Sequence, residues 1–331
     1  MVEAAGVDTW SVCWYLGVDS PAQKAMEALA SDPAKRSFLL PEAVHGHRVG
    51  WFPGTRLLFA EGHPGGEDGL CAGHKLPDAL QRVSEGLRDR GILPPRFPLR
   101  PRFDARNRAI KEGGVGFAGL RRLDSTVDLC FETAAEGLAA LSGVAAVPVP
   151  RMKTEFVREV GGSRMETVYF SGTSGKRKLG RWYDKGNETG AERRGLWLRA
   201  EDQRRYQKET RLCVEQVASG SFVRDQFVQR FEPLWRASKG VRVGSPVELA
   251  QRIGELVDDG VLTPRQAVDV AGWLLLEQAG ENRQARSTWF RKRRRCADLG
   301  LVVADGTVDP VDVDLAEIIE RALDSSSWGE G

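Results

Sequence analysis

The sequence predicts an α+β protein in which an antiparallel sheet, with helices packed on one face, is followed by a helical region. Short aromatic and β-branched runs in the first half are typical of strands, and segments with helical spacing of apolar residues lie between them. Beyond residue 219 the helical spacing takes over. A chain of 331 residues is long enough for two domains, which we expect over residues 1–235 and 236–331.

In the first part, strands are predicted over 7–15 and over a hairpin, 49–60, that turns at Pro53-Gly54. Helical spacing predicts helices over 21–30 and 77–90. Further strands are expected over 122–131, where apolar and polar residues alternate, and over 166–170 and 179–185. A turn and the basic residues Lys176, Arg177 and Lys178 join the last two strands, and these three residues are predicted to contact DNA.

In the last part, capping and stop signals outline a series of helices. A wide apolar stripe predicts a helix over 222–235, and Ser245-Pro-Val-Glu248 and Thr263-Pro264 open two more, which Gly260 and Gly280 end. A further helix over 285–299 ends at Gly300 and leads into a strand from Leu301. Three short helices followed by a strand predict a winged helix-turn-helix.

Composition excludes several classes of protein. The chain has 48 Lys and Arg against 46 Asp and Glu, so it is not a uniformly basic binder. No stretch reaches the roughly 20 apolar residues that a bilayer span needs, and the first residues do not resemble a signal peptide, so no membrane contact is expected. Five widely spaced cysteines argue against a disulfide framework. We therefore expect a cytoplasmic protein in a reducing compartment.

The helix predicted over 285–299 carries a dense group of cations. Such a concentration of like charge complements a phosphate backbone, which predicts contact with DNA. The alternative is a solvated face near a helix C-terminus, where cations are favoured in any case. The residues concerned are Arg286, Arg291, Lys292, Arg293, Arg294 and Arg295.

Three other motifs predict no site. The glycine-rich run 113–119 lacks the Gly-Lys-Ser/Thr and the framing strand of nucleotide-binding loops, so we interpret it as a loop. Cys71 and His74 have metal-like spacing, with His63 before them, but zinc needs a second pair. His45-Gly-His47 resembles the paired histidine ligands of some nucleases, yet its position before the hairpin favours a surface turn.

Tyr183 lies in the segment Gly180-Arg-Trp-Tyr-Asp-Lys-Gly-Asn-Glu188. On a strand, Arg181, Tyr183 and Lys185 share one face. A phenol has a reference pKa near 10, so a nucleophilic phenolate needs positive charge nearby, which Arg181 and Lys185 are placed to supply. The alternative is a structural tyrosine at a sheet edge with two snorkelling cations.

Four blocks of sequence, taken in order, resemble the Rep-trans class of rolling-circle replication initiators, which serve small plasmids and filamentous phages. The class has blocks that read approximately Arg-hydrophobic-Asp-x-x-x-Asp, Tyr-Asn/Asp-Lys-x-x-Glu and Arg-x-x-x-Glu. The resemblance covers about residues 110 to 220. The matching segments are residues 122–128, 168–172, 181–188 and 211–215.

The resemblance implies an RRM-like domain over residues 1–235 that nicks and rejoins one DNA strand at an origin. The family's tyrosine carries over to Tyr183, with Lys185 and Arg181 beside it, and would form a 5′-phosphotyrosine and leave a free 3′-hydroxyl. This chemistry requires Tyr183 to be exposed in an acid-lined hollow that bears cations. The region 236–331 would recognise double-stranded origin DNA, and a helicase partner and a homodimer are compatible with the resemblance.

The resemblance also implies a divalent cation, Mg²⁺ or Mn²⁺, held by carboxylate oxygens. The candidates are Asp124, Asp128 and Glu215, with Glu188 holding either the metal or Lys185. On a straight strand Asp124 and Asp128 lie about 13 Å apart, so they do not both reach one ion unless the chain bends. The alternative for the aspartates and Glu215 is a carboxylate paired with Arg122 or Arg211.

Two rival functions stay open at this point. The first is a non-enzymatic DNA-binding regulator that uses the same winged helix. The second is a conjugative relaxase, which has the same chemistry but acts in DNA transfer.

Overall fold

The chain divides into two compact units whose segments interleave along the sequence. Unit 1 consists of Met1–Glu3, Val127–Asp202 and Phe227–Ser325, and unit 2 of Ala4–Thr126, Gln203–Gln226 and Ser326–Gly331. The computed structural model describes residues 2–29, 38–66, 69–95, 114–158, 165–172, 178–189, 193–206, 212–218, 221–244, 246–278, 286–303, 312–323 and 328.

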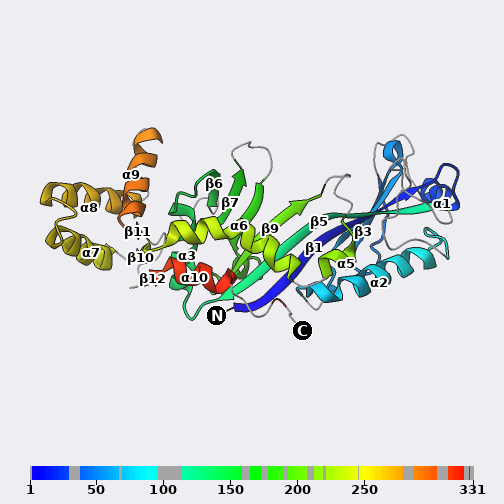
Figure 1. The fold of residues 1–331 in the computed structure, drawn as a ribbon, viewed down its shortest axis with the longest axis horizontal. Coiled ribbons are helices and arrows are strands. Elements are labelled where there is room, and N and C mark those ends of the chain that lie inside the picture. The colour runs from blue at the N-terminus through cyan, green and yellow to red at the C-terminus, as the bar shows by residue number, and fades with distance from the viewer. Residues whose placement is uncertain are drawn as a thin grey trace. The chain divides into compact units, whose positions relative to one another are not determined.

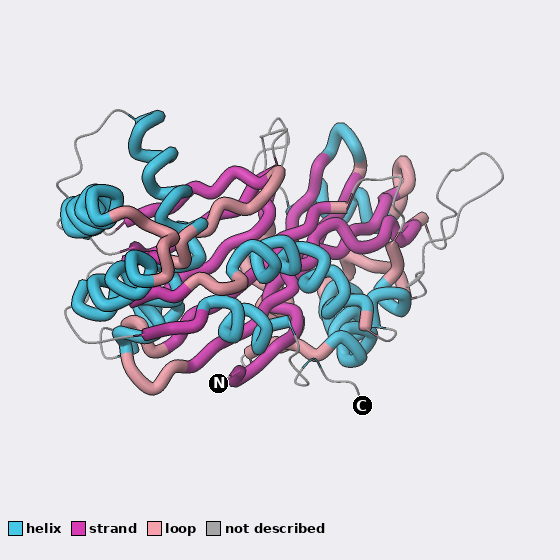
Figure 2. The backbone as a smooth tube through the Cα atoms, turned by 60° about the vertical axis from the view of Figure 1, so that its left-hand side comes forward, coloured by secondary structure: helices cyan, strands magenta, loops and turns pink. Residues whose placement is uncertain are grey.

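Unit 2 is built on a sheet of order β2-β3-β4-β1-β5, and strand β5 continues into unit 1. Its pairs β1–β4, β3–β4 and β2–β3 are antiparallel. Figures 1 and 2 show helix α2 alongside these strands. The elements are β1 (Val2–Leu16), α1 (Pro21–Leu29), β2 (Phe38–Leu39), β3 (Arg48–Phe52), β4 (Leu57–Gly62), α2 (Leu76–Asp89), β5 (Val115–Cys130) and α5 (Val214–Ala218).

Alternation along β1 gives this sheet two different faces. Trp10, Val12 and Trp14 are fully buried on one face, whereas Ser11, Cys13 and Tyr15 point to the other. The predicted hairpin is confirmed, because β3 and β4 pair across a short 3-10 turn, Pro53–Thr55. The second face carries polar and aromatic side chains, of which Ser11 and Cys13 are buried.

The His45-Gly46 turn fits the prediction, but His47 beyond it is buried. His45 and Gly46 have positive φ angles of 46° and 73°, and Val44 and His47 exchange backbone hydrogen bonds around them. The Trp10 Nε1–H donates to His47 Nε2 at 2.7 Å, and His47 Nδ1 lies 2.7 Å from the His45 carbonyl oxygen. Both ring nitrogens form hydrogen bonds, so His47 is a neutral structural residue. This agrees with the interpretation of His45-Gly-His47 as a turn rather than as a pair of metal ligands.

Unit 1 contains the sheet segment β5-β9-β8-β7-β6 and a small three-stranded sheet of order β11-β10-β12. The elements are α3 (Ala134–Ala146), β6 (Met152–Arg158), β7 (Met165–Gly172), β8 (Lys178–Asp184), α4 (Lys185–Thr189), β9 (Trp197–Arg205), α6 (Phe222–Ser238), β10 (Arg242–Gly244), α7 (Pro246–Asp258), α8 (Pro264–Gln278), α9 (Arg286–Asp298), β11 (Leu301–Val303), β12 (Asp312–Asp314) and α10 (Leu315–Leu323).

One face of this sheet is apolar and packs against helices. Phe231 of α6 makes edge-on contacts with Phe170 and Trp182, each with ring centroids 6.1 Å apart. Helix α3 also packs against β7 and β8, and a capping box between Thr133 and Glu136 fixes its start. The predicted α+β fold with a large antiparallel sheet and helices is therefore confirmed. Because Trp182 points into this core, the residues on either side of it in β8 point to the opposite face.

In the region 236–331, the start of α8 and the ends of α7 and α9 lie where the sequence predicts them. Thr263 and Gln266 exchange capping hydrogen bonds at the start of α8, and Gly260 and Gly300 take positive φ angles after α7 and α9. A wing needs β11 and β12 to form a hairpin, but each pairs with β10 instead, β11 in parallel. The three helices and following strand are present, whereas the winged-helix arrangement is not confirmed.

Several boundaries differ from the predictions. Strand β8 ends at Asp184, so Lys185 opens helix α4 instead of extending the strand. Helix α6 continues past residue 235 to Ser238, and the predicted domain division at 235 and 236 stays a prediction. Strands β6 and β9 and helices α3 and α10 were not predicted. The interpretation of the glycine-rich run 113–119 as a loop is wrong, because Val115 already begins strand β5; Gly113 lies outside the described residues.

The neutral His47 ring predicts a loss of stability in mild acid. Burial lowers the pKa of His47 below its ordinary value, so the unfolded chain binds a proton that the folded chain resists. Its contribution is complete above about pH 6.5 and is lost as the pH falls through and below that value. Denaturant unfolding from about pH 7.5 to about pH 5 should show a steeper fall in unfolding free energy for the wild type than for His47→Gln.

His45→Asn is the matched control, because Asn tolerates the positive φ of that turn position and leaves His47 in place. Equal pH dependence of wild type and His47→Gln would contradict the assignment.

Candidate active site around Tyr183

Tyr183 lies in the middle of the polar face of the unit 1 sheet. Strand pairing sets Thr167 of β7 on one side of it and Arg199 of β9 on the other. Directly opposite residues of antiparallel strands share a face, so the neighbouring row brings Arg181 beside Glu201. The face that holds the tyrosine therefore also holds two arginines and a carboxylate from adjacent strands.

The phenol is buried among charged groups. Tyr183 is 4% exposed, and the Arg181 guanidinium carbon lies 4.5 Å from the centre of its ring. Burial raises the pKa of Tyr183 and the Glu201 charge raises it further, whereas Arg181 and Arg199 lower it. The expected acids and cations are therefore present, but the expected exposure is wrong, and the phenol is held neutral at physiological pH.

Glu201 links the two strands through Arg181. Its Oε2 accepts a hydrogen bond from Arg181 Nη2 at 2.6 Å, and the side chain is completely buried. Its Oε1 has no hydrogen-bond partner among the described residues. A buried carboxylate that is half satisfied is costly, so this group depends on the arginine beside it.

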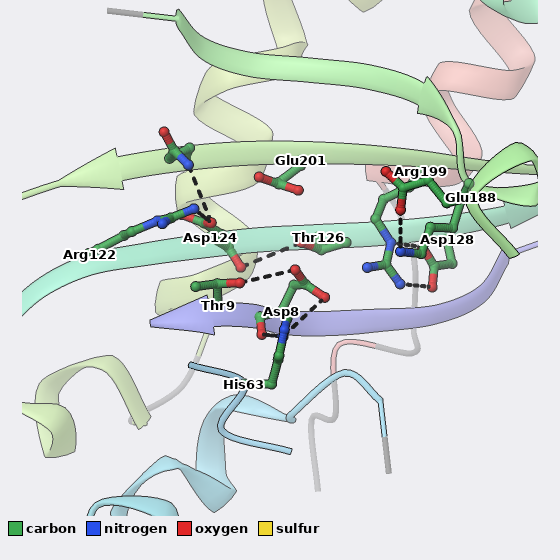
Figure 3. A network of polar contacts seen from close by, with 12 residues as sticks. Asp8, Thr9, His63, Arg122, Asp124, Thr126, Asp128, Glu188, Arg199 and Glu201 are labelled. Carbon is green, nitrogen blue, oxygen red and sulfur yellow. Dashed lines mark hydrogen bonds and ion pairs between the residues drawn. The ribbon is translucent and has the colours of Figure 1, made fainter. Parts of the chain in front are cut away.

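Arg199 is held by Asp128 of β5 in a two-pronged ion pair (Figure 3). Arg199 Nε and Nη2 donate to the two carboxylate oxygens at 2.6 and 2.7 Å, and both side chains are less than 10% exposed. Such a pair fixes the plane of the guanidinium next to Tyr183. Asp128 thus acts as a partner of arginine, although a different arginine from those predicted.

Asp184 shapes the turn that follows the tyrosine. Its carboxylate accepts hydrogen bonds from the backbone N–H groups of Asn187 at 3.1 Å and Gly195 at 3.0 Å. Burial raises the pKa of Asp184, against these donors, which lower it. A Cβ at Gly186 would lie 1.7 Å from the Arg193 carbonyl oxygen, so only glycine fits there. The Tyr-Asp-Lys-Gly motif is thereby explained as a tight strand-to-helix junction.

The prediction that Lys185 continues the strand and shares the face of Tyr183 by alternation is wrong, whereas its role in catalysis stays a prediction. Because β8 has ended, Lys185 lies in α4, where its Nζ donates to Glu188 Oε2 at 2.6 Å. The expectation that Glu188 holds Lys185 is confirmed. The second cation next to Tyr183 is Arg199 instead.

Two of the predicted metal ligands, Asp124 and Asp128, are paired with arginines. Asp124 is paired with Arg122, with the shorter contact 2.5 Å long (Figure 3), which is the alternative left open by the sequence. Glu215 lies in α5 of unit 2, and Arg211 is outside the described residues. Within the described parts of the chain, no three His, Cys, Asp or Glu side chains form a cluster suited to a metal, Cys71 and His74 included.

The basic residues of α9 form a partly exposed group. Arg291, Arg294 and Arg295 are exposed, whereas Lys292 donates to Asp269 of α8 at 3.0 Å. Arg293 is half-buried, and Arg286 opens the helix. Of the basic run before Tyr183, Lys178 begins β8, while Lys176 and Arg177 lie outside the described residues.

Sequence reasoning missed Arg199 and Glu201, although a signal was present. In Leu198-Arg-Ala-Glu-Asp202, charged residues alternate with apolar ones, as expected of a strand with one polar face. Only the pairing of β9 with β8 shows that these charges meet the tyrosine.

Comparison with known proteins gives one distant structural likeness. No family model and no curated protein matches the chain. A solved structure of a rolling circle replication initiator protein from Geobacillus stearothermophilus resembles it with a TM-score of 0.32 and 16% identity, covering 65% of this chain and 78% of that one. None of the described helices has the length and apolar character that a membrane span requires.

The ion pair between Asp128 and Arg199 predicts a large cost for removing one partner. Asp128→Asn should lower the unfolding free energy by about 3–5 kcal/mol, because a buried guanidinium loses its counter-charge. The double variant Asp128→Asn/Arg199→Gln should recover part of that loss in a denaturant double-mutant cycle.

If Asp128→Asn unfolds like the wild type but binds Mn²⁺ more weakly, Asp128 is a metal ligand and the ion-pair account is contradicted. Glu188→Gln, which changes an exposed carboxylate, is the control for a nonspecific effect of charge.

Proposed function

We propose that this protein is a DNA-nicking and joining enzyme of the replication-initiator kind, with Tyr183 as the nucleophile. The observation that carries the proposal is the position of this phenol beside the Arg181 guanidinium and directly opposite Arg199 on one polar sheet face. A core tyrosine needs no such neighbours, whereas attack on a phosphodiester needs positive charge at the phosphate. The ordered sequence blocks that resemble rolling-circle initiators support the same chemistry.

In the proposed reaction the Tyr183 oxygen attacks the phosphorus of one phosphodiester. The new bond joins the phenolic oxygen to phosphorus, and the bond from phosphorus to the 3′-oxygen breaks. The phenolic proton leaves to solvent, and the departing 3′-oxygen takes a proton from water, so the products are a 5′-phosphotyrosine and a 3′-hydroxyl. Reversal rejoins the strand, because the covalent intermediate conserves the phosphodiester bond energy.

The two arginines supply the charge that this step needs. A guanidinium matches phosphate geometry with two parallel donors, and a desolvated face strengthens each interaction. In the described state their charges are matched by Glu201 and Asp128. We therefore infer that an incoming phosphate competes with these carboxylates for Arg181 and Arg199, and that the side chains over Tyr183 move to admit the strand.

The resemblance implies Mg²⁺ or Mn²⁺ as a cofactor, but the described carboxylates do not fit such an ion. Asp124 and Asp128 are committed to arginines, and Glu188 to Lys185. The proposal therefore assigns no residue to a metal and routes no step through one.

For the region 236–331 we propose binding of double-stranded origin DNA through α9. Its exposed residues Arg291, Arg294 and Arg295 supply phosphate contacts without further rearrangement. This division leaves the cleavage of a single-stranded segment to the sheet. A cytoplasmic setting, a helicase partner and a homodimer belong to the same proposal.

The burial of Tyr183 favours a second candidate, a DNA-binding regulator without enzymatic activity. A phenol that is 4% exposed, with a raised pKa, is what a structural tyrosine would show. In this candidate the ion pairs around it only stabilise the sheet.

Substitution of Tyr183 by Phe separates the two candidates. Wild-type protein should convert supercoiled plasmids that carry the DNA flanking its gene into nicked circles, with DNA covalently attached to the protein. Tyr183→Phe should lose both products and retain DNA binding and thermal stability, because only the phenolic oxygen is removed. Gel assays of plasmid form and of protein-linked DNA, run with Mg²⁺, with Mn²⁺ and with a chelator, provide the measurement.

Tyr169→Phe, which changes a half-buried phenol on the neighbouring strand β7, is the matched control and should keep the activity. Nicking by Tyr183→Phe at the wild-type rate would assign the nucleophile elsewhere. No nicking of any plasmid by the wild type would support the regulator.

A second prediction concerns the pH dependence of nicking. Glu201 raises the pKa of Tyr183, so Glu201→Gln should lower that pKa and shift the rising limb of the rate to lower pH. Single-turnover cleavage of an oligonucleotide substrate measured against pH is the test. Glu188→Gln should shift the profile less, because Glu188 has the smaller effect on the phenol. An unchanged profile for Glu201→Gln would show that the phenol does not titrate in the rate-limiting step.

A further inference from the structure

The polar face of the unit 2 sheet carries aromatic rings, of which Phe52 is exposed and Tyr15 and Phe59 are half-buried. Strand pairing places Phe52 of β3, Leu57 of β4 and Tyr15 of β1 in one row across the sheet. The next row contains Gly50 and Phe59. These side chains point away from the buried tryptophans, because alternation sends Trp14 and Leu58 to the opposite face. We call Tyr15, Phe52, Phe59, Arg48, Arg121 and Arg122 the aromatic-arginine face.

Phe52 and Phe59 form a stacked pair in which Phe52 is exposed and Phe59 is half-buried. Their ring centroids lie 5.2 Å apart with 28° between the planes, and Phe52 is 40% exposed. Phe59 lies over Gly50, where an added Cβ would come within 2.4 Å of its ring. The glycine therefore lets a phenyl ring rest on the backbone of β3, and the pair forms a flat platform that contributes little to the buried core.

Arginines lie beside this platform. Arg121 Nη2 donates to the Tyr15 hydroxyl at 3.2 Å, and Arg122 Nη1 contacts Glu61 at 3.0 Å. Arg48 has a 70% exposed side chain and reaches the same Glu61 at 3.6 Å. An exposed ion pair of that length adds little stability, so Arg48 is available to another anion.

We propose that the aromatic-arginine face binds single-stranded DNA, with bases stacked on Phe52 and Phe59 and backbone phosphates held by the arginines. Flat exposed rings beside cations are the features by which proteins hold unpaired strands, since every base has a face that can stack. An apolar protein partner would not use the arginines, and duplex DNA offers no free base faces. The choice of DNA over RNA rests on the proposed function, whereas the binding of an unpaired strand does not.

The test is fluorescence anisotropy with a labelled oligothymidylate of about 15 nucleotides, which is near the site size of single-strand binding folds. It uses the full chain with Tyr183→Phe, so that no cleavage occurs. Phe52→Leu/Phe59→Leu should weaken binding by about tenfold or more, because leucine keeps the apolar contact and loses the stacking. Arg48→Gln should lower the slope of log affinity against log salt by about one.

Val268→Ala, which changes another exposed apolar side chain on α8, is the matched control and should bind like the parent. Unchanged affinity in the double Phe variant, with an unchanged melting temperature, would overturn the proposal. So would tighter binding of a duplex than of the single strand. Tighter binding of oligouridylate than of oligothymidylate would overturn the assignment to DNA.

A concentration-dependent dimer that the double variant abolishes would show that the platform pairs two copies of the chain, and this too would overturn the proposal. Because the assay contains no nicking step, it fails or succeeds independently of Tyr183. Loss of nicking with intact strand binding would remove the proposed enzyme and leave this site.

Discussion

The register of β8 against β9 is the constraint on which the candidate site depends. It places Arg199 directly opposite Tyr183 and Glu201 directly opposite Arg181. A slip of one residue would send Tyr183 into the apolar core and Trp182 to the polar face, because side chains alternate along a strand. Trp182 holds the register, since its ring packs against Phe231 of α6.

The polar face is stabilised by charges that satisfy each other rather than by apolar burial. Arg181 and Arg199 each hold a buried carboxylate on this face. A third pair, between Arg230 of α6 and the fully buried Asp202 at 2.8 Å, lies on the opposite face, because Asp202 is paired with Gly180 in the row that α6 covers. Each pair is stable only while both members are present, because a single buried charge is costly. These ion pairs fix the positions of the arginines. An added anion such as a phosphate would compete with the carboxylates for them.

The sequence predicts the parts of this structure that depend on local patterns. Alternation predicts the second half of β5 and most of β8, and the signals at Thr263, Gly260 and Gly300 predict the helix ends. The local sequence pattern does not show which strands pair with each other. Arg199 and Glu201 were therefore not predicted to lie beside Tyr183, although their own strand has one polar face. The prediction that Lys185 continues the strand also failed. Asp184 ends β8, because its carboxylate accepts hydrogen bonds from the backbone N–H groups of Asn187 and Gly195.

We propose that the oxygen of Tyr183 becomes bonded to DNA. To test this, the protein is trapped with labelled single-stranded DNA from the region flanking its gene, the complex is digested with protease, and the DNA-linked peptide is sequenced. We expect a single modified peptide containing Trp182-Tyr183-Asp184, with the nucleotide on the phenolic oxygen. A modified residue in any other peptide, or DNA binding without a covalent adduct on every strand tested, would contradict it.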